Sequence, residues 1–431
     1  MPELNIPVTA RERLAWCLFD FANSSFTTII ITVGYSVYFI QVVVGNDPSS
    51  AGQGEALWGA GYSICMILVA VLSPLLGAIA DYRATKKEYL MAVTALCIIC
   101  TAALYFVGPG DVLFGLIMVG IANIGFELGY TFYNAFLVEL ADREDMGRLS
   151  GYGWGLGYLG GLLSLAIAYP FMKGGLGADN LNTFRQSFIA TAAFFLIASV
   201  PTFVYLRERA VPKPSLPGMR AWTIGFTRLT RTFREIRRYR ELFVYLIAFL
   251  IYSDGINTVV VFSGIFAAKV LGFTPADLII YFLITQLTAG AGSYAFGVLT
   301  DRIGAKPVIG ITLGLWIGIV VWAFAVRTPL EFYAIGLIAG AALGGNQAAS
   351  RTLLALFTPV GRQAEFFGFF SLSGKFAATL GPLVYGQIVL WTGNQRLAVL
   401  MLGIFFLIGW GVLGLVSEKA GLEAAEQGAD V

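Results

Sequence analysis

Hydrophobic residues fall into twelve long runs along the chain, separated by shorter polar segments. The runs cover residues 14–44, 56–80, 88–107, 112–140, 149–172, 184–206, 241–269, 276–299, 305–326, 330–356, 364–391 and 395–416. A helix needs about 20 apolar residues to cross the hydrocarbon of a bilayer. The pattern therefore predicts an all-α membrane protein with twelve transmembrane helices. The first run is too long for the apolar region of a signal peptide, so we expect it to be retained.

One long polar segment divides these runs into two groups of six. It covers residues 207–240 and contains the basic stretch TRLTRTFREIRRYR, which is typical of an amphipathic helix on a membrane surface. We therefore expect a six-helix bundle over 1–206, a basic linker over 207–240, and a second bundle with a short tail over 241–431.

The basic residues indicate which way the helices are oriented. If the N-terminus lies inside, 21 of the 28 Lys and Arg residues fall on the side of the linker and five on the other. Lys and Arg are enriched in cytoplasmic loops. We therefore expect both termini and the linker in the cytoplasm, in a bacterial inner (plasma) membrane.

Composition agrees with a membrane protein and argues against other classes. The chain is 57% hydrophobic and 13% charged, whereas soluble domains carry about a quarter charged residues. A net charge of +2 gives no reason to expect a nucleic-acid partner. Histidine, the commonest metal ligand, is missing from the sequence, and no Gly-x-x-x-x-Gly-Lys-Ser/Thr loop occurs. We expect no enzyme activity, no metal, no cofactor and no ATP-driven pumping.

A short motif occurs twice, with its copies 220 residues apart. It reads GAIADYRATKK in the first half and GVLTDRIGAK in the second. Glycine allows close helix approach, the aspartate can accept hydrogen bonds from a helix N-terminus, and the cations can face anionic lipid headgroups. We expect the motif to govern a gate on the linker side without contacting a solute. The gate residues are Gly77, Asp81, Arg83 and Lys86, and Gly297, Asp301, Arg302 and Lys306.

A second, weaker sequence repeat links the first and seventh predicted helices. Asp20 and Asn23 recur as Asp254 and Asn257, with the acid and the amide three residues apart on one helical face. Together with the duplicated gate motif, this similarity supports two parallel repeats with a solute site between them.

The gate motif resembles the loop signature of the major facilitator superfamily. Helix number, linker and orientation agree with that superfamily over the whole chain. The first copy has Ala84 where glycine is usual, whereas the second has Gly304.

Five further segments resemble the vacuolar-effluxer-like branch of this superfamily. They are LAWCLFDFANSSF, TFYNAFLVELA, SGYGWGLGYLGG, GGNQAASRTLLA and EFFGFFSLSGKFAATLGPLVYG. Val138 precedes Glu139 where the branch commonly has proline. Yeast members of the branch are linked to autophagy and release amino acids from the vacuole. The resemblance implies a secondary transporter of amino acids or similarly small polar solutes.

Six charged residues of the predicted helices are candidates for a functional role. A charge at the bilayer centre costs about 2.5–3.5 kcal/mol on insertion scales, so such residues usually face a cavity or a partner. Four acids outnumber two bases, so two acids would lack a basic partner and could carry protons. The six are Asp20, Glu127, Glu139, Asp254, Arg351 and Lys375.

We predict that a solute or coupling site is formed by intramembrane polar residues from both halves. In a zwitterionic solute, the carboxylate would bind Arg351 or Lys375 and the amine Glu127 or Asp254. A structural salt bridge remains an alternative for both bases, and interfacial anchoring for Asp20. The predicted set is Asp20, Asn23, Glu127, Tyr130, Asn134, Asp254, Asn257, Asn346, Gln347, Arg351 and Lys375.

Other polar and aromatic residues of the helices are assigned to other roles, and two other functions are considered for the protein. Glu139 is assigned to the gate. Tyr133 and Trp154 could line the cavity, but packing against lipid is favoured for both. A multidrug or lipophilic-solute exporter of the same fold would need a large apolar cavity, which the many amides argue against. A non-transporting receptor or scaffold has no evident need for two gate motifs. We expect a monomer whose partners are a small solute, membrane lipids and, if the cycle is proton-coupled, protons.

Overall fold

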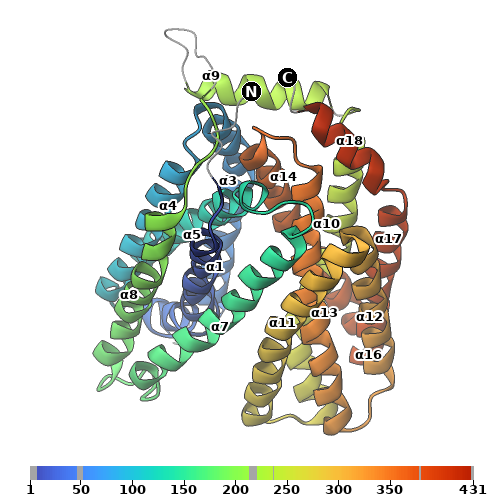
Figure 1. Ribbon diagram of the computed structural model, residues 1–431. Coiled ribbons are helices and arrows are strands. Elements are labelled where there is room, and N and C mark those ends of the chain that lie inside the picture. The colour runs from blue at the N-terminus through green and yellow to red at the C-terminus, as the bar shows by residue number, and fades with distance from the viewer. Residues whose placement is uncertain (1–6, 46–51, 213–220, 236, 378–379, 429–431) are drawn as a thin grey trace.

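The computed structural model describes residues 7–45, 52–212, 221–235, 237–377 and 380–428. Every regular element among these residues is a helix, and the helices form two bundles side by side (Figure 1). Ten helical segments of the described chain are long and apolar enough to cross a membrane. Two further segments, residues 329–357 and residues 363–376 with 380–392, complete the twelve spans of the predicted fold.

The first bundle contains six spans. The first span begins as α1 (Ala10–Ser25) and continues through a π-helical stretch (Phe26–Val33), α2 (Tyr35–Tyr38) and a second π-helical stretch (Phe39–Val44). The others are α3 (Gln53–Arg83), α4 (Lys86–Ala103) with the 3-10 turn Leu104–Phe106, α5 (Val112–Ala135) with α6 (Leu137–Leu140), α7 (Met146–Met172) and α8 (Leu181–Tyr205).

The second bundle is built in the same way. Its spans are α10 (Arg240–Leu271), α11 (Pro275–Ile303), α12 (Ala305–Ala325), α13 (Pro329–Phe357), α14 (Gln363–Phe376) with α15 (Leu380–Thr392), and α16 (Gln395–Met401) with α17 (Gly403–Gly414). The predicted run 364–391 is thus described as two helices, and residues 378 and 379 between them lie outside the described residues. The C-terminal α18 (Glu418–Gly428) follows.

Helix α7 lies between the two bundles and packs against both α1 and α11. A Cβ at Gly160 would lie 2.0 Å from the carbonyl oxygen of Phe21 in α1, and one at Gly151 would lie 2.3 Å from that of Ser293 in α11. Only glycine permits such close contact on two faces of one helix. The glycine-rich run in α7 therefore serves close helix packing.

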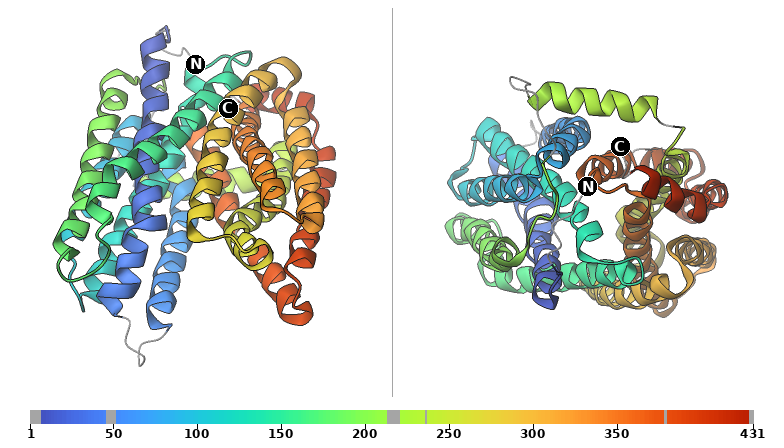
Figure 2. Two further views of the ribbon diagram at one scale, coloured as in Figure 1. Left: turned by 90° about the horizontal axis from the view of Figure 1, so that it is seen from below. Right: turned by 45° about the horizontal axis from the view of Figure 1, so that its top comes forward.

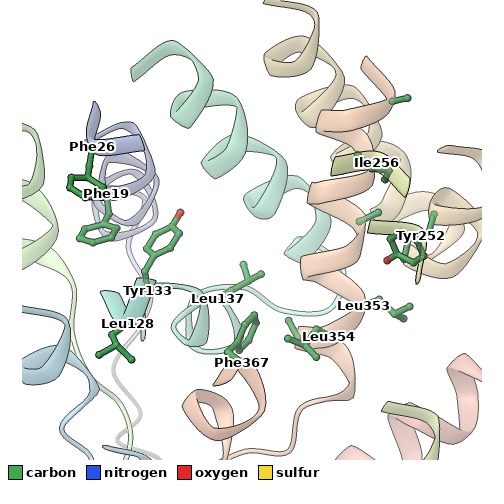
Figure 3. Packing of buried hydrophobic residues seen from close by; sticks show 14 of the residues in the cluster. Phe19, Phe26, Leu128, Tyr133, Leu137, Tyr252, Ile256, Leu353, Leu354 and Phe367 are labelled. Carbon is green, nitrogen blue, oxygen red and sulfur yellow. The ribbon is translucent and has the colours of Figure 1, made fainter. Parts of the chain in front are cut away.

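Buried aromatic side chains fix α1 against α5 in the first bundle (Figure 3). Tyr133 stacks on Trp16 and Phe19, with ring centroids 4.5 Å and 5.1 Å apart. Where α6 meets α13 of the second bundle, Figure 3 shows Leu137 beside Leu354 and Phe367. This packing brings the polar faces of α5, α13 and α14 toward one another.

A single linker helix, α9 (Ala221–Arg234), lies across both bundles (Figures 1 and 2). Gly225 packs against Leu75 and Ile79 of α3, and Thr232 donates a hydrogen bond to the Glu365 carboxylate at the start of α14. The amphipathic helix predicted on the membrane surface therefore packs on both halves of the protein. The preceding part of the predicted linker, residues 213–220, lies outside the described residues.

Candidate functional site

The two gate motifs form matching contacts between the bundles on the face where α9 lies, called here the linker face. Asp81 of α3 accepts hydrogen bonds from the backbone N–H groups of Ala364 (3.0 Å) and Glu365 (2.8 Å) at the start of α14. Each carboxylate oxygen thus satisfies one free N–H at a helix N-terminus, where the helix dipole also favours a negative charge.

The second copy makes the same contact with the bundles exchanged. Asp301 of α11 accepts hydrogen bonds from the backbone N–H groups of Gly147 (2.7 Å) and Arg148 (3.0 Å) at the start of α7. A Cβ at Gly77 would lie 2.2 Å from the Ala364 carbonyl oxygen, and one at Gly297 would lie 2.6 Å from that of Gly147. The glycine and the aspartate of each motif therefore both contribute to a close contact between the bundles on the linker face.

The basic residues of the motif have several environments. Lys86 is fully buried and pairs with Glu139, which differs from the expected contact with lipid headgroups. Lys306 donates to backbone carbonyl oxygens at the end of α17, including that of Val416 (2.5 Å). Arg83 and Arg302 are exposed on the linker face.

Both motifs end at a residue with positive φ. Gly304 has φ of 93°, and Ala84, in the place where glycine is usual, has φ of 54°. Ala84 is the one non-glycine residue with positive φ in the described chain. The positive φ is therefore kept in the first copy at a cost in backbone strain.

Between the bundles lies a cavity of about 170 Å³. Most of its wall comes from α5 of the first bundle and from α10, α13 and α14 of the second. Eight lining residues belong to the predicted site: Glu127, Tyr130, Asn134, Asn257, Asn346, Gln347, Arg351 and Lys375. The remaining lining residues are Thr131, Trp154, Phe249, Ser253, Ile256, Leu343, Ser350, Phe367, Phe370, Ser371 and Gly374.

An ion pair between the two bundles forms part of the cavity wall. The Lys375 ammonium on α14 donates to the Glu127 carboxylate on α5. The side chain of Glu127 is 7% exposed and that of Lys375 is 25% exposed, so the pair is largely shielded from solvent but open on the lysine side. An ion pair of this kind can exchange partners with a solute that carries both charges.

Arg351 is held more completely than Lys375. Its guanidinium pairs with Asp20 (3.2 Å), and it donates to Asn134 (3.0 Å) and to the hydroxyl of Ser150 (2.9 Å). The cation also lies 5.0 Å from the ring of Trp16, an arrangement that adds cation–π attraction. These contacts join α13 to α1, α5 and α7, which favours the structural alternative for Arg351.

Asp20, Asn23 and Asp254 lie outside the described cavity lining. Asp20 is buried in its pair with Arg351, so interfacial anchoring does not describe its position. Asp254 accepts hydrogen bonds from the backbone N–H groups of Leu380 (3.0 Å) and Gly381 (2.9 Å) at the start of α15. Asn23 is buried, and its amide nitrogen has no partner among the described residues.

The amides of the cavity use several of their hydrogen-bonding groups within the protein. Asn257 donates to the carbonyl oxygen of Ala377 (2.8 Å), and Asn346 donates to Thr312 (3.0 Å). Gln347 accepts a hydrogen bond from the hydroxyl of Tyr158 (2.5 Å). These amides therefore fix the shape of the wall as well as its polarity.

Sequence reasoning missed part of the cavity. Trp154, for which packing against lipid is favoured over cavity lining, does line the cavity, and its indole N–H is buried with no hydrogen-bond partner in the described chain. Phe249 and Phe370 stack with ring centroids 4.1 Å apart and close another part of the wall. The sequence carries no local signal for Trp154, because the contact that brings its helix beside Arg351 joins residues about 200 positions apart.

Comparison with known proteins places this geometry in a family. The chain is 29% identical over 425 residues to the MFS-type transporter YxiO of Bacillus subtilis, with 98% of each chain covered. It is 26% identical over 344 residues to autophagy-related protein 22 of Yarrowia lipolytica, covering 72% of this chain but 57% of that one.

Solved structures show the same fold. The proton:xylose symporter XylE superposes with a TM-score of 0.72 at 17% identity, covering 96% of this chain and 98% of that one. The human organic anion transporter MFSD10 superposes with a TM-score of 0.73 at 14% identity, covering 95% and 100%. The family described as vacuole effluxer Atg22 like matches residues 56–426. The chain therefore belongs to this family of membrane transporters of the major facilitator fold.

Proposed function

We propose that this transporter moves an amino acid or a related zwitterion by alternating access. The observation that carries the proposal is the Glu127–Lys375 ion pair, which the two bundles contribute to one cavity. Breaking a buried ion pair for a neutral solute would leave two uncompensated charges, which costs several kcal/mol. A zwitterion avoids this cost because its ammonium replaces Lys375 beside Glu127 and its carboxylate replaces Glu127 beside Lys375.

The same exchange couples binding to movement of the bundles. Glu127 belongs to the first bundle and Lys375 to the second, so their pair is a contact between the halves. A solute that binds between Glu127 and Lys375 replaces their direct contact with one contact to each residue. Because the substituted contacts differ between the two conformations, the solute can shift the equilibrium between them.

We extend the proposal to orientation, proton coupling and oligomeric state. The linker face is the cytoplasmic face in the proposed orientation, so the arrangement described here is closed to the cytoplasm. Glu127 is the cavity acid that would take up a proton when the solute's ammonium leaves. We further propose that the protein works as a monomer in a bacterial inner membrane.

Flux measurements in reconstituted vesicles test this function. Wild-type protein is expected to exchange radiolabelled amino acids, and an imposed pH gradient is expected to change the rate. Glu127→Gln should abolish exchange while membrane expression stays normal, because the amide cannot neutralise an ammonium. Glu144→Gln is the matched control, since Glu144 is exposed outside the cavity.

Two results would count against the proposal. Exchange retained in Glu127→Gln removes this residue from the site. If neither amino acids nor a pH gradient alters flux of any labelled solute, both the solute class and the proton coupling are wrong.

A further inference from the structure

A second cavity, of about 260 Å³, lies between α1 and α7 on the linker side of the molecule. Its polar end is formed by Arg13, Asp145 and Arg148. Its apolar part includes Leu14, Leu149 and Tyr152, of which Leu14 is 55% and Tyr152 46% exposed. The central solute site shares no lining residue with this groove.

The polar end carries a net positive charge. Asp145 accepts from both guanidinium groups, that of Arg13 at 3.1 Å and that of Arg148 in a second ion pair. One carboxylate thus faces two cations whose side chains are 32% and 46% exposed. A guanidinium offers five N–H donors in a planar fork suited to phosphate, so a single phosphodiester would balance the remaining charge.

The shape of the groove matches one membrane leaflet. The lining on α7 runs from Asp145 to Leu156, which is about 16 Å along a helix axis at 1.5 Å per residue. Half of a bilayer's hydrocarbon thickness is about 15 Å. The charged residues lie at the linker end and the apolar ones toward the membrane interior, which is the order of headgroup and acyl chain in a phospholipid.

We propose that this groove binds one anionic phospholipid, with its phosphate at Arg13 and Arg148 and an acyl chain along Leu14, Leu149 and Tyr152. The site adjoins the gate, because the backbone N–H of Arg148 donates to Asp301 and the ring of Tyr152 packs on Tyr294 of α11 with centroids 5.1 Å apart. A lipid bound there holds the start of α7 in place and stabilises the closed linker face.

Native mass spectrometry of the full-length protein tests the site. The purified chain is titrated with micelles containing phosphatidylglycerol or phosphatidylcholine, and lipid adducts are counted. We expect one preferred phosphatidylglycerol adduct per chain. Arg148→Gln, which keeps the backbone N–H, should weaken that adduct about fivefold, and Leu14→Trp should weaken it by filling the apolar part without changing any charge.

The matched control is Arg143→Gln. Arg143 lies close by in sequence but outside the groove lining, in an exposed pair with Glu426, and its loss should leave the adduct unchanged. Equal adducts with phosphatidylcholine, or equal weakening by Arg143→Gln and Arg148→Gln, would overturn the proposal. Thermal unfolding of each variant identifies any that fails to fold, and the two groove variants act on separate ends of the site.

Discussion

The aspartates of the two gate motifs offer a direct test of how the linker face is held closed. Asp301→Asn keeps the size of the side chain but replaces one of its two acceptor oxygens with a donor. In the structure those oxygens accept from Gly147 and Arg148 of the other bundle. Because this contact crosses between bundles, its loss should raise the free energy of the closed arrangement alone.

The magnitude follows from the contacts that are lost. A hydrogen bond to a charged group contributes about 1.5–3 kcal/mol, and a negative charge at a helix N-terminus adds about 0.3–1 kcal/mol. A loss of about 1.4 kcal/mol changes an equilibrium tenfold. Asp301 is partly exposed whereas Asp81 is 2% exposed, so we expect about a tenfold shift toward linker-face opening for Asp301→Asn and a larger one for Asp81→Asn.

Distances between spin labels can measure this shift. One pair at Glu144 and Ile303 reports on the linker face, and a second pair at Lys173 and Leu330 reports on the opposite face; all four positions are exposed. The four native cysteines are buried, which favours selective labelling. In Asp301→Asn the first distance should lengthen and the second shorten, as one population replaces the other.

The matched control is Asp142→Asn, an exposed aspartate on the same face, which should leave both distance distributions unchanged. The reasoning is refuted if Asp81→Asn and Asp301→Asn also leave them unchanged while the labelled proteins remain folded. A lengthening of both distances together would indicate general loosening of the bundles and would refute the gate role equally.

Three further predictions concern stability, measured by thermal unfolding in detergent. Burial raises the pKa of Glu208 to about 6, so the charged carboxylate destabilises the fold above pH 6, and this destabilisation fades as pH falls toward 4.5. Glu208→Gln should therefore stabilise the protein by about 1–2 kcal/mol at pH 7.5. The same substitution should have no effect near pH 4.5. Arg351→Gln should destabilise by about 3–5 kcal/mol because Asp20 is left as a lone buried charge, and adding Asp20→Asn should recover most of the loss. Gly344→Ala should destabilise by about 1–3 kcal/mol, since its Cβ would lie 2.0 Å from the Ala289 carbonyl oxygen.

Each of these three has its own contrary outcome. An equal effect of Glu208→Gln at both pH values would show that burial of its charge is not the cause. A double variant no more stable than Arg351→Gln would show that loss of packing dominates over loss of the charge pair. Gly318→Ala is the control for Gly344→Ala because no atom lies within 4 Å of its Cβ position, and equal destabilisation by both would contradict the packing argument.

The sequence by itself determined the membrane fold and part of the gate. Span length and hydrophobicity are properties of contiguous residues, so twelve spans could be counted without tertiary information. The duplicated motif also predicted a bond from its aspartates to a helix N-terminus, because the N–H groups and the dipole there favour a negative charge. The family resemblance, confirmed by comparison, rested on segments that can likewise be read locally.

Only the tertiary structure decided which partner each charge takes. Four acids and two bases were visible in the sequence, but Glu127 binds Lys375 across 248 residues and Asp20 binds Arg351 across 331. Asp254 echoes Asp20 in sequence yet binds backbone N–H groups of α15. The charge of a residue and its place in a hydrophobic run predict that it needs a partner. Which side chain or helix end comes within hydrogen-bonding distance of that charge depends on how separate helices pack.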